Sequence, residues 1–269
     1  MKPFVFTLRQ EPAQRVDLSA LAPDRIAGRS AAEIEKIEIG TTKAPIRVGD
    51  VFRVDAGDPG VVRFEGGSAR FDQVGAKLLP GHSVHVDGDV GAQLGRLAKG
   101  GRIVVTGSAG AYAASGNAGA LIEIGGNAGD FLAAPLAGEL AGMSGGRVIV
   151  RGNTGARAGD RLRRGVIVIE GDAGEDLGSR LIAGSIVVLG AAAGRVGYLN
   201  RRGTIILAKV REPGPTYVDC GEHILTFAGL FARSLMADSP RAAEILKGKL
   251  RRYGGDTAVY GKGEILIPA

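Results

Sequence analysis

The chain has 269 residues, a formal net charge of +6, 45 glycines and one cysteine. A single cysteine excludes an intramolecular disulfide framework and is typical of a reducing compartment, so we expect a cytoplasmic protein. The first residues lack the apolar segment of a signal peptide, and no run reaches the roughly 18 apolar residues of a membrane span.

Residues 1–45 are predicted to form an N-terminal lead-in and cap. The segment FVFTLRQ from Phe4 alternates apolar and polar residues, as a strand does. Ser19 and Ser30 are candidate helix caps, and AAEIEKI after Ser30 predicts a short helix. Residues 46–67 resemble degenerate early copies of the repeat that follows, and atypical end repeats would cover an open apolar end.

One pattern, an apolar strand followed by a glycine-rich turn, recurs every 19 residues. The lead glycines are Gly88, Gly107, Gly126, Gly152, Gly171 and Gly190, at intervals of 19, 19, 26, 19 and 19 residues. A period near 20 residues is typical of a solenoid, in which a repeat buries its apolar face only against a stacked neighbour. The 26-residue interval is one period plus seven residues, so it predicts an insertion.

Two positions are apolar in every repeat, four and two residues before the lead glycine. The two columns are Val84, Ile103, Ile122, Val148, Ile167, Ile186 and Ile205, and Val86, Val105, Ile124, Val150, Ile169, Val188 and Leu207. Alternation with period two places both columns on one face, so strands stacked about 4.8 Å apart would bury two apolar ladders. Asp or Asn follows four lead glycines, which predicts turns with side-chain hydrogen bonds to the backbone; these residues are Asp89, Asn127, Asn153 and Asp172.

Each repeat is too short to hold a helix of its own. We therefore predict an all-β fold, a single-stranded parallel β-helix over residues 46–209, right-handed as crossovers between parallel strands usually are. Pro213 and Pro215 break the pattern, so residues 210–269 are predicted to form a C-terminal cap. In this cap, LTFAGLFARSLM and AAEILKGKLRRY are predicted to be helical, and GKGEILIP predicts a final strand.

The position three residues before the lead glycine should point outward, yet it is apolar in most repeats. It holds Val104, Ile149, Val168, Val187 and Ile206, with Glu123 as the exception. An outward apolar strip predicts an interface with another protein, or a surface that this chain's own tail helix covers. Both interpretations keep these side chains out of bulk water.

A cluster of arginines follows the later repeats. Its members are Arg157, Arg161, Arg163, Arg164, Arg180, Arg195, Arg201 and Arg202. Several occupy equivalent places in successive repeats, so we predict a basic flank that favours an acidic partner. Nucleic acid is not expected, because the aromatic residues that stack on bases are missing. A solvated face that contacts other subunits is the alternative.

No catalytic or metal site is predicted in this chain. Its three histidines are His82, His85 and His223, without the ligand spacing of a zinc or iron–sulfur site. Cys220 with His223 nearby would make a nucleophile pair, but a small residue in a loop is the simpler interpretation. The carboxylates of Asp172, Glu175 and Asp176 share one turn without aromatic sugar platforms, which disfavours an enzyme that acts on polysaccharides.

Three glycine-rich stretches carry a family resemblance: GMSGGRVIVRGNTGARAG (142–159), GDVGAQLG (88–95) and GDAGEDLG (171–178). They resemble the repeat domain shared by the C subunit of formylmethanofuran dehydrogenase and the C-terminal part of the glutamate synthase large subunit. The resemblance covers about residues 45–210. The chain is nearly all repeat, as in the stand-alone C subunit. Its composition, rich in Ala, Arg and Gly, resembles that of proteins from a bacterium with a GC-rich genome. This suits the bacterial formyltransferase/hydrolase relative.

This resemblance implies a non-catalytic scaffold subunit in one-carbon metabolism. In the bacterial complex a formyl group passes from tetrahydromethanopterin to methanofuran, and formate is released during formaldehyde oxidation. The implied partners are an amidohydrolase-like A subunit, a B subunit and a formyltransferase D subunit, in a hetero-oligomer whose C subunit alone binds no cofactor.

The glutamyl tail of methanofuran is polyanionic, so the resemblance also implies a binding role for part of the basic flank. The residues expected to contact this tail are Arg161, Arg163, Arg164, Arg201 and Arg202. The C subunit of an archaeal-type formylmethanofuran dehydrogenase, and a glutamate-synthase-type spacer domain acting in trans, stay open as alternatives.

Overall fold

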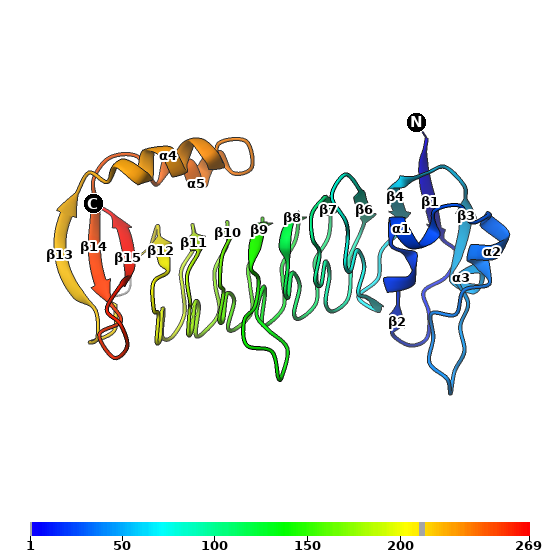
Figure 1. The fold of residues 1–269 in the computed structure, drawn as a ribbon, viewed down its shortest axis with the longest axis horizontal. Coiled ribbons are helices and arrows are strands. Elements are labelled where there is room, and N and C mark those ends of the chain that lie inside the picture. Colours follow the sequence, from blue (N-terminus) through cyan, green and yellow to red (C-terminus); the bar gives the residue numbers. More distant parts are fainter. Residues whose placement is uncertain (1, 210–212) are drawn as a thin grey trace.

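A computed structural model describes residues 2–209 and 213–269. Residues 210–212, with which the predicted C-terminal cap begins, lie outside the described residues. In the described residues, one large and mostly parallel sheet organises the molecule, and few helices accompany it (Figure 1). The prediction of an all-β fold is confirmed at this level.

The strands are β1 (Pro3–Leu8), β2 (Val16–Asp17), β3 (Phe52–Asp55), β4 (Asp58–Glu65), β5 (Phe71–Asp72), β6 (Ser83–Asp87), β7 (Arg102–Val105), β8 (Ala118–Ile124), β9 (Gly145–Val150), β10 (Val166–Ile169), β11 (Ser185–Val188), β12 (Thr204–Leu207), β13 (Val218–His223), β14 (Leu250–Gly255) and β15 (Gly263–Pro268). The helices are the 3-10 turn η1 (Ser19–Leu21) and α1 (Pro23–Ile26), α2 (Ala31–Glu35), α3 (Val48–Val51), α4 (Thr226–Leu235) and α5 (Pro240–Glu244). The large sheet has 13 strands in the order β13-β14-β15-β12-β11-β10-β9-β8-β7-β6-β4-β1-β3, and β2 pairs separately with β5.

The stacked repeats from β6 to β12 form the repeat stack, in which each strand pairs in parallel with the strand one period later. Ile167 lies opposite Ile186, and Ile186 opposite Ile205. Every member of the two predicted columns is buried, none more than 3% exposed, so both ladders are confirmed. Each buried aliphatic side chain stabilises the stack by about 1.5–3 kcal/mol before conformational entropy is subtracted. A second line of parallel bridges, from Val90 to Ala192, joins the turns beyond the glycines.

The polar side chains after the lead glycines join one repeat to the next. Oδ1 of Asp89 accepts the backbone N–H of Ser108 at 2.7 Å, and Oδ1 of Asn153 accepts that of Asp172 at 2.8 Å. The sequence predicted bonds to the backbone in these turns. The structure adds that they cross to the following repeat, so each turn satisfies the donor of its neighbour and reinforces the register.

The N-terminal part closes one end of the stack with aromatic side chains. Phe6, Phe52 and Phe64 are at most 2% exposed, and the rings of Phe6 and Phe64 stack with their centroids 4.9 Å apart. Ser30 caps α2 as predicted, since its Oγ accepts the N–H of Glu33 at 3.3 Å in a capping box. The Ser19 prediction is wrong, because its side chain caps no helix there and its own N–H donates to Asp17.

Residues 46–57 do not form an early repeat, contrary to the sequence interpretation. They contain α3 and then β3, which pairs antiparallel with β1 at the edge of the sheet. The first parallel strand before the repeat stack is β4, where Val62 lies opposite Val84. The apolar alternation of FRVD suits a strand of either direction, so the pattern could not distinguish the two.

The C-terminal part combines α4 and α5 with three strands. β15 pairs in parallel with β12 and continues the buried ladder, with Ile265 opposite Ile205. The predicted final strand is thus confirmed. The second predicted helix is too long, because α5 ends at Glu244 and the segment LRRY lies in β14. Pairing with β15 overrides the helix propensity of this segment, with Tyr253 opposite Ile265.

Candidate functional site

The outward apolar column lies mostly beneath the chain's own tail. Ile149, Val168, Val187 and Ile206 are fully buried, and they share one core cluster with apolar residues of α4 and α5. Figure 1 shows both helices running along one side of the repeat stack. The tail helices therefore cover these four side chains. This is the second of the two interpretations given above, in which the chain's own tail shields the column. Val104 is half-buried and lies outside this cluster.

The outward column changes character where the helical cover ends. In register, Ile149 is followed towards the N-terminus by Glu123, then Val104 and then His85. All three of these are only half-buried. The column is thus aliphatic where helices cover it and mixed where they do not, which explains the exception at Glu123.

A polar network fastens the two helices to the stack. Arg147 of β9 forms an ion pair with Asp238, and its Nη1 also donates to the backbone oxygen of Ser234 at 2.9 Å. Ser239, the N-cap of α5, donates through Oγ to Glu170 at 2.6 Å. Sequence reasoning missed this network, although charged residues flanking an apolar outward column were a signal for it.

The arginine cluster divides into paired and free members. Arg180 donates from Nε to Asp160 at 2.9 Å, and Arg195 lies 3.1 Å from Asp176. Arg157 lies 3.9 Å from the Asp176 carboxylate. These three arginines share two carboxylates of neighbouring repeats, Asp160 and Asp176, so the structure does not support a continuous basic flank through them.

The remaining five arginines we call the arginine flank: Arg161, Arg163, Arg164, Arg201 and Arg202. Arg161 is half-buried and donates from Nη1 to the backbone oxygen of Glu139 at 3.1 Å. The other four are exposed, and within residues 2–209 and 213–269 none of them makes an ion pair with a carboxylate. They form two Arg-Arg pairs on alternate repeats, separated by Ile182 and Ala183, so the pairs lie about 9.5 Å apart along the stack.

The seven-residue insertion lies beside this flank. It forms the green loop between β8 and β9 that extends below the other turns in Figure 1. Glu139 of the loop accepts a hydrogen bond from Nη2 of Arg96 at 2.7 Å, which lowers the pKa of this carboxyl. Leu140 follows with its side chain 90% exposed. The insertion is therefore anchored at one side and presents an apolar side chain to the surroundings.

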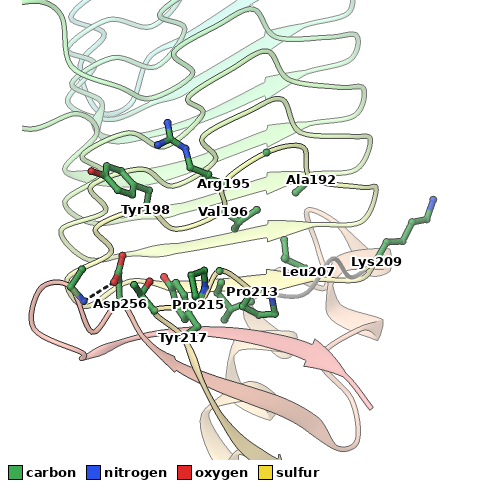
Figure 2. A pocket seen from close by; sticks show the side chains of 15 residues that line it. Ala192, Arg195, Val196, Tyr198, Leu207, Lys209, Pro213, Pro215, Tyr217 and Asp256 are labelled. Atoms are coloured by element: carbon green, nitrogen blue, oxygen red, sulfur yellow. Dashed lines mark hydrogen bonds between the residues drawn. The ribbon is translucent and has the colours of Figure 1, made fainter.

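A cavity of about 330 Å³ lies between the last repeat and the C-terminal strands (Figure 2). Leu207, Val196 and Ile265 give it an apolar lining. Its polar groups bind the chain itself: the hydroxyl of Tyr217 donates to the backbone oxygen of Gly197 at 3.0 Å, and Asp256 accepts the N–H of Ala258 at 2.8 Å. Burial raises the pKa of Tyr217 to about 12, so this phenol stays protonated at neutral pH. The cavity could hold a small apolar group.

The remaining sequence candidates stay apart from these surfaces. Nε2 of His223 lies 2.8 Å from the backbone oxygen of Cys220, and the thiol points to Val218 instead, so no nucleophile pair forms. His85 is half-buried in the outward column, and its Nε2 lies 3.2 Å from the Asp87 carboxylate. The described residues contain no group of three or more His, Cys, Asp or Glu side chains that could hold a metal ion. Within the same residues, no helix is long and apolar enough to cross a membrane.

Comparison with known proteins gives the family. No protein-family model matches the chain. The chain is 44% identical over 262 residues to the C subunit of the formyltransferase/hydrolase complex Fhc of Methylorubrum extorquens, covering 97% of this chain and 98% of that protein. Its structure also matches a chain in the crystal structure of the formyltransferase/hydrolase complex (FhcABCD) from Methylorubrum extorquens in complex with methylofuran. The TM-score of this match is 0.91 and the sequence identity is 41%. That match covers 98% of this chain and 99% of the other. The chain therefore belongs to the family formed by the C subunits of formyltransferase/hydrolase complexes.

Proposed function

We propose that this chain is the C subunit of a formyltransferase/hydrolase complex, in which it is a scaffold for catalytic partner subunits. The observation that carries the proposal is similarity over the full length, 44% in sequence and a TM-score of 0.91 in structure, to a subunit of such a complex. The partners would be an amidohydrolase-like A subunit, a B subunit and a formyltransferase D subunit. The complex would transfer a formyl group from tetrahydromethanopterin to methanofuran, or to the methylofuran of the relative, and release formate.

The architecture suits a scaffold. Parallel strands at a 19-residue period, with a second ladder of bridges beyond the glycines, support a single-stranded β-helix of right-handed coil. We propose a division into an N-terminal cap (1–45), a middle part (46–209) that holds the repeat stack, and a C-terminal cap (210–269), with α3 and β3 as non-repeat elements at the start of the middle part. A stack of this kind is rigid along its axis, because every repeat is bonded to both neighbours, and it offers long side faces to partners. We also place the chain in the cytoplasm, in keeping with its exposed free thiol at Cys220.

The arginine flank would bind the glutamyl tail of the furan cofactor. Four exposed guanidinium groups have no carboxylate partner among the described residues, and they occur in two pairs on alternate repeats. Guanidinium groups bind carboxylates through paired hydrogen bonds, and a row of them suits a chain of carboxylates. Arg161 would contribute less, since one of its nitrogens already bonds the backbone of Glu139.

Binding of poly-L-glutamate to the isolated chain tests this role. We expect the double variant Arg163→Ala/Arg164→Ala to bind about 10-fold more weakly than the wild type and to show a weaker dependence on salt. The matched control, Arg29→Ala/Lys43→Ala, removes the same charge from exposed positions in the N-terminal part. An equal loss of affinity in both variants would show that net charge alone explains the binding. No loss of affinity in either variant would reject the site.

Purification of the native assembly through a tag on this chain tests the main proposal. Co-elution of an amidohydrolase-like chain and a formyltransferase supports the bacterial complex. A pterin-binding partner would support the archaeal-type dehydrogenase instead, and an amidotransferase partner the glutamate-synthase-type spacer. Elution of the chain alone at its monomer mass would contradict all three.

A further inference from the structure

The helix α4 is apolar on two opposite sides. Its inner side packs Ala228, Ala232 and Leu235 against the repeat stack. Its outer side carries Phe227 and Leu230, which are 40% and 62% exposed. The only charged residue in its ten positions is Arg233. A helix that is apolar all round is normally buried all round, so the outer side calls for a cover.

Exposed apolar residues lie on α4 and on the segments next to it. Phe227 and Leu230 lie three residues apart and form an exposed apolar stripe on α4, and Ile224, which precedes the helix, is 79% exposed. Beside the stripe, a groove of about 430 Å³ runs between α4 and the segment 246–248, with Met236 and Leu246 in its lining. We call the stripe and the groove together the α4 surface.

Gly229 leaves the surface of α4 open in this groove. It lies within α4, and a Cβ added there would meet no atom within 4 Å. Glycine in a helix costs roughly 0.5–1 kcal/mol relative to alanine, and the space above it would tolerate alanine without a clash. A partner that packs closely against the helix backbone accounts for the missing side chain.

The charges at the rim distinguish the kinds of partner. Arg233 and Lys247 line the groove, and Lys249 lies just beyond it on the exposed surface. Lys247 pairs with Glu244 at 2.6 Å and Lys249 with Glu222 at 3.9 Å, whereas Arg233 has no ion pair among the residues that the structure describes. A second copy of this chain, docked face to face, would offer Arg233 only carboxylates that Lys247 and Lys249 already pair. A free carboxylate on a partner of another sequence would complement Arg233.

We propose that the α4 surface docks a helix of a partner subunit, with an apolar seam over Gly229 and Leu230 and a carboxylate facing Arg233. The proposal rests on the assignment of the chain to a hetero-oligomeric complex. It moves the predicted interface outward: the tail helices cover the outward column, and their own outer side meets the partner. An amphipathic helix in an apolar groove is a frequent mode of such recognition.

Two variants test the docking in the assembled complex. Leu230→Asp places a charge in the stripe, and Gly229→Trp fills the groove at a position where an added Cβ meets no atom within 4 Å. The control, Val259→Asp, changes an apolar residue that is 37% exposed in the turn between β14 and β15. Circular dichroism and thermal unfolding of each isolated chain establish that it folds, and native mass spectrometry of the tagged assembly reads out the bound subunits.

We expect both variants to fold like the wild type and to bind at least one partner subunit about 10-fold or more weakly, while Val259→Asp assembles normally. Intact assembly of folded Leu230→Asp and Gly229→Trp chains would overturn the docking site and leave the scaffold proposal standing. Failure of the wild-type chain to recruit any partner would overturn the scaffold proposal itself. If the isolated wild-type chain is a dimer and the isolated Leu230→Asp chain is a monomer, the surface binds a second copy of this chain, which contradicts the inference.

Discussion

The guanidinium of Arg147 in β9 forms an ion pair with Asp238 in the turn between α4 and α5, although 91 residues separate them. Both side chains are mostly shielded from water, 27% and 17% exposed. The pair therefore fixes the position at which the tail helices lie on the repeat stack. The helical cover ends near this pair, since Glu123 of the preceding repeat is only half-buried and lies outside the core cluster that α4 and α5 share with the stack.

Removing this anchor should loosen the helices without opening the stack. Arg147→Ala leaves Asp238 without its partner, and we expect a loss of about 1–3 kcal/mol in the free energy of unfolding. Hydrogen exchange should rise over residues 226–244 and stay slow over β10 and β11. Arg102→Ala is the control, because the Arg102 side chain is 59% exposed in its pair with Glu123. Unchanged exchange in the Arg147 variant would mean that apolar packing alone holds the helices.

The inner ladders should dominate stability. Ile167 is fully buried between Val148 and Ile186, so Ile167→Ala should cost about 2–5 kcal/mol in urea unfolding. Val61, which is 42% exposed on β4, is the control, and Val61→Ala should change stability by less than about 0.5 kcal/mol. Similar losses for the two variants would contradict the buried ladder.

Lysine placed in the outward column should distinguish covered from uncovered repeats. Val168 is fully buried beneath the tail helices, so Val168→Lys must either bury an ammonium group or displace α4 and α5. Val104 occupies the equivalent position outside the cover and is half-buried, so Val104→Lys should fold normally. Tryptic cleavage within residues 226–249 measures the difference. Resistance to cleavage in the Val168 variant, equal to that of the wild type, would refute the helical cover.

Acid should release the insertion loop from Arg96. The Arg96 hydrogen bond lowers the pKa of Glu139 in the folded chain, so this ion pair contributes stability above the ordinary carboxyl pKa of about 4.3. The contribution is lost as the pH falls through the lowered folded value. Glu139→Gln should therefore unfold more readily than the wild type at neutral pH, and the two proteins should converge in strong acid. A difference that persists in acid would show that the glutamine disturbs packing rather than the ion pair.

The sequence predicted the repeat stack well and the N-terminal and C-terminal parts poorly, for physical reasons. Period-two alternation identifies buried positions such as Ile167 and Ile186, because every repeat meets an identical neighbour one period away. The pairing of β3 with β1 and the strand β14 follow no period, so local pattern alone assigned them wrongly. The segment around Tyr253 has the composition of a helix and becomes a strand only because Ile265 lies opposite it.

The arginine cluster and the outward column were predicted only in part, because periodicity gives a residue's position in the stack but not its side-chain contacts. Spacing alone placed Arg163 and Arg201 in equivalent positions of the stack. It could not show that Arg180 and Arg195 are neutralised by Asp160 and Asp176, because this depends on side-chain direction. The outward column was a correct signal for shielding, while its cover depended on contacts about 90 residues apart, such as that between Arg147 and Asp238.

Formate release by the assembled complex, measured with and without this chain, tests the scaffold role most directly. The purified partner subunits would be given formyl-tetrahydromethanopterin and the furan cofactor, and both the rate and the mass of the assembly would be recorded. We predict that the chain alone is inactive, and that its addition raises the rate together with the mass of the complex. Formate release by the chain alone, or the same rate and mass without it, would contradict the account.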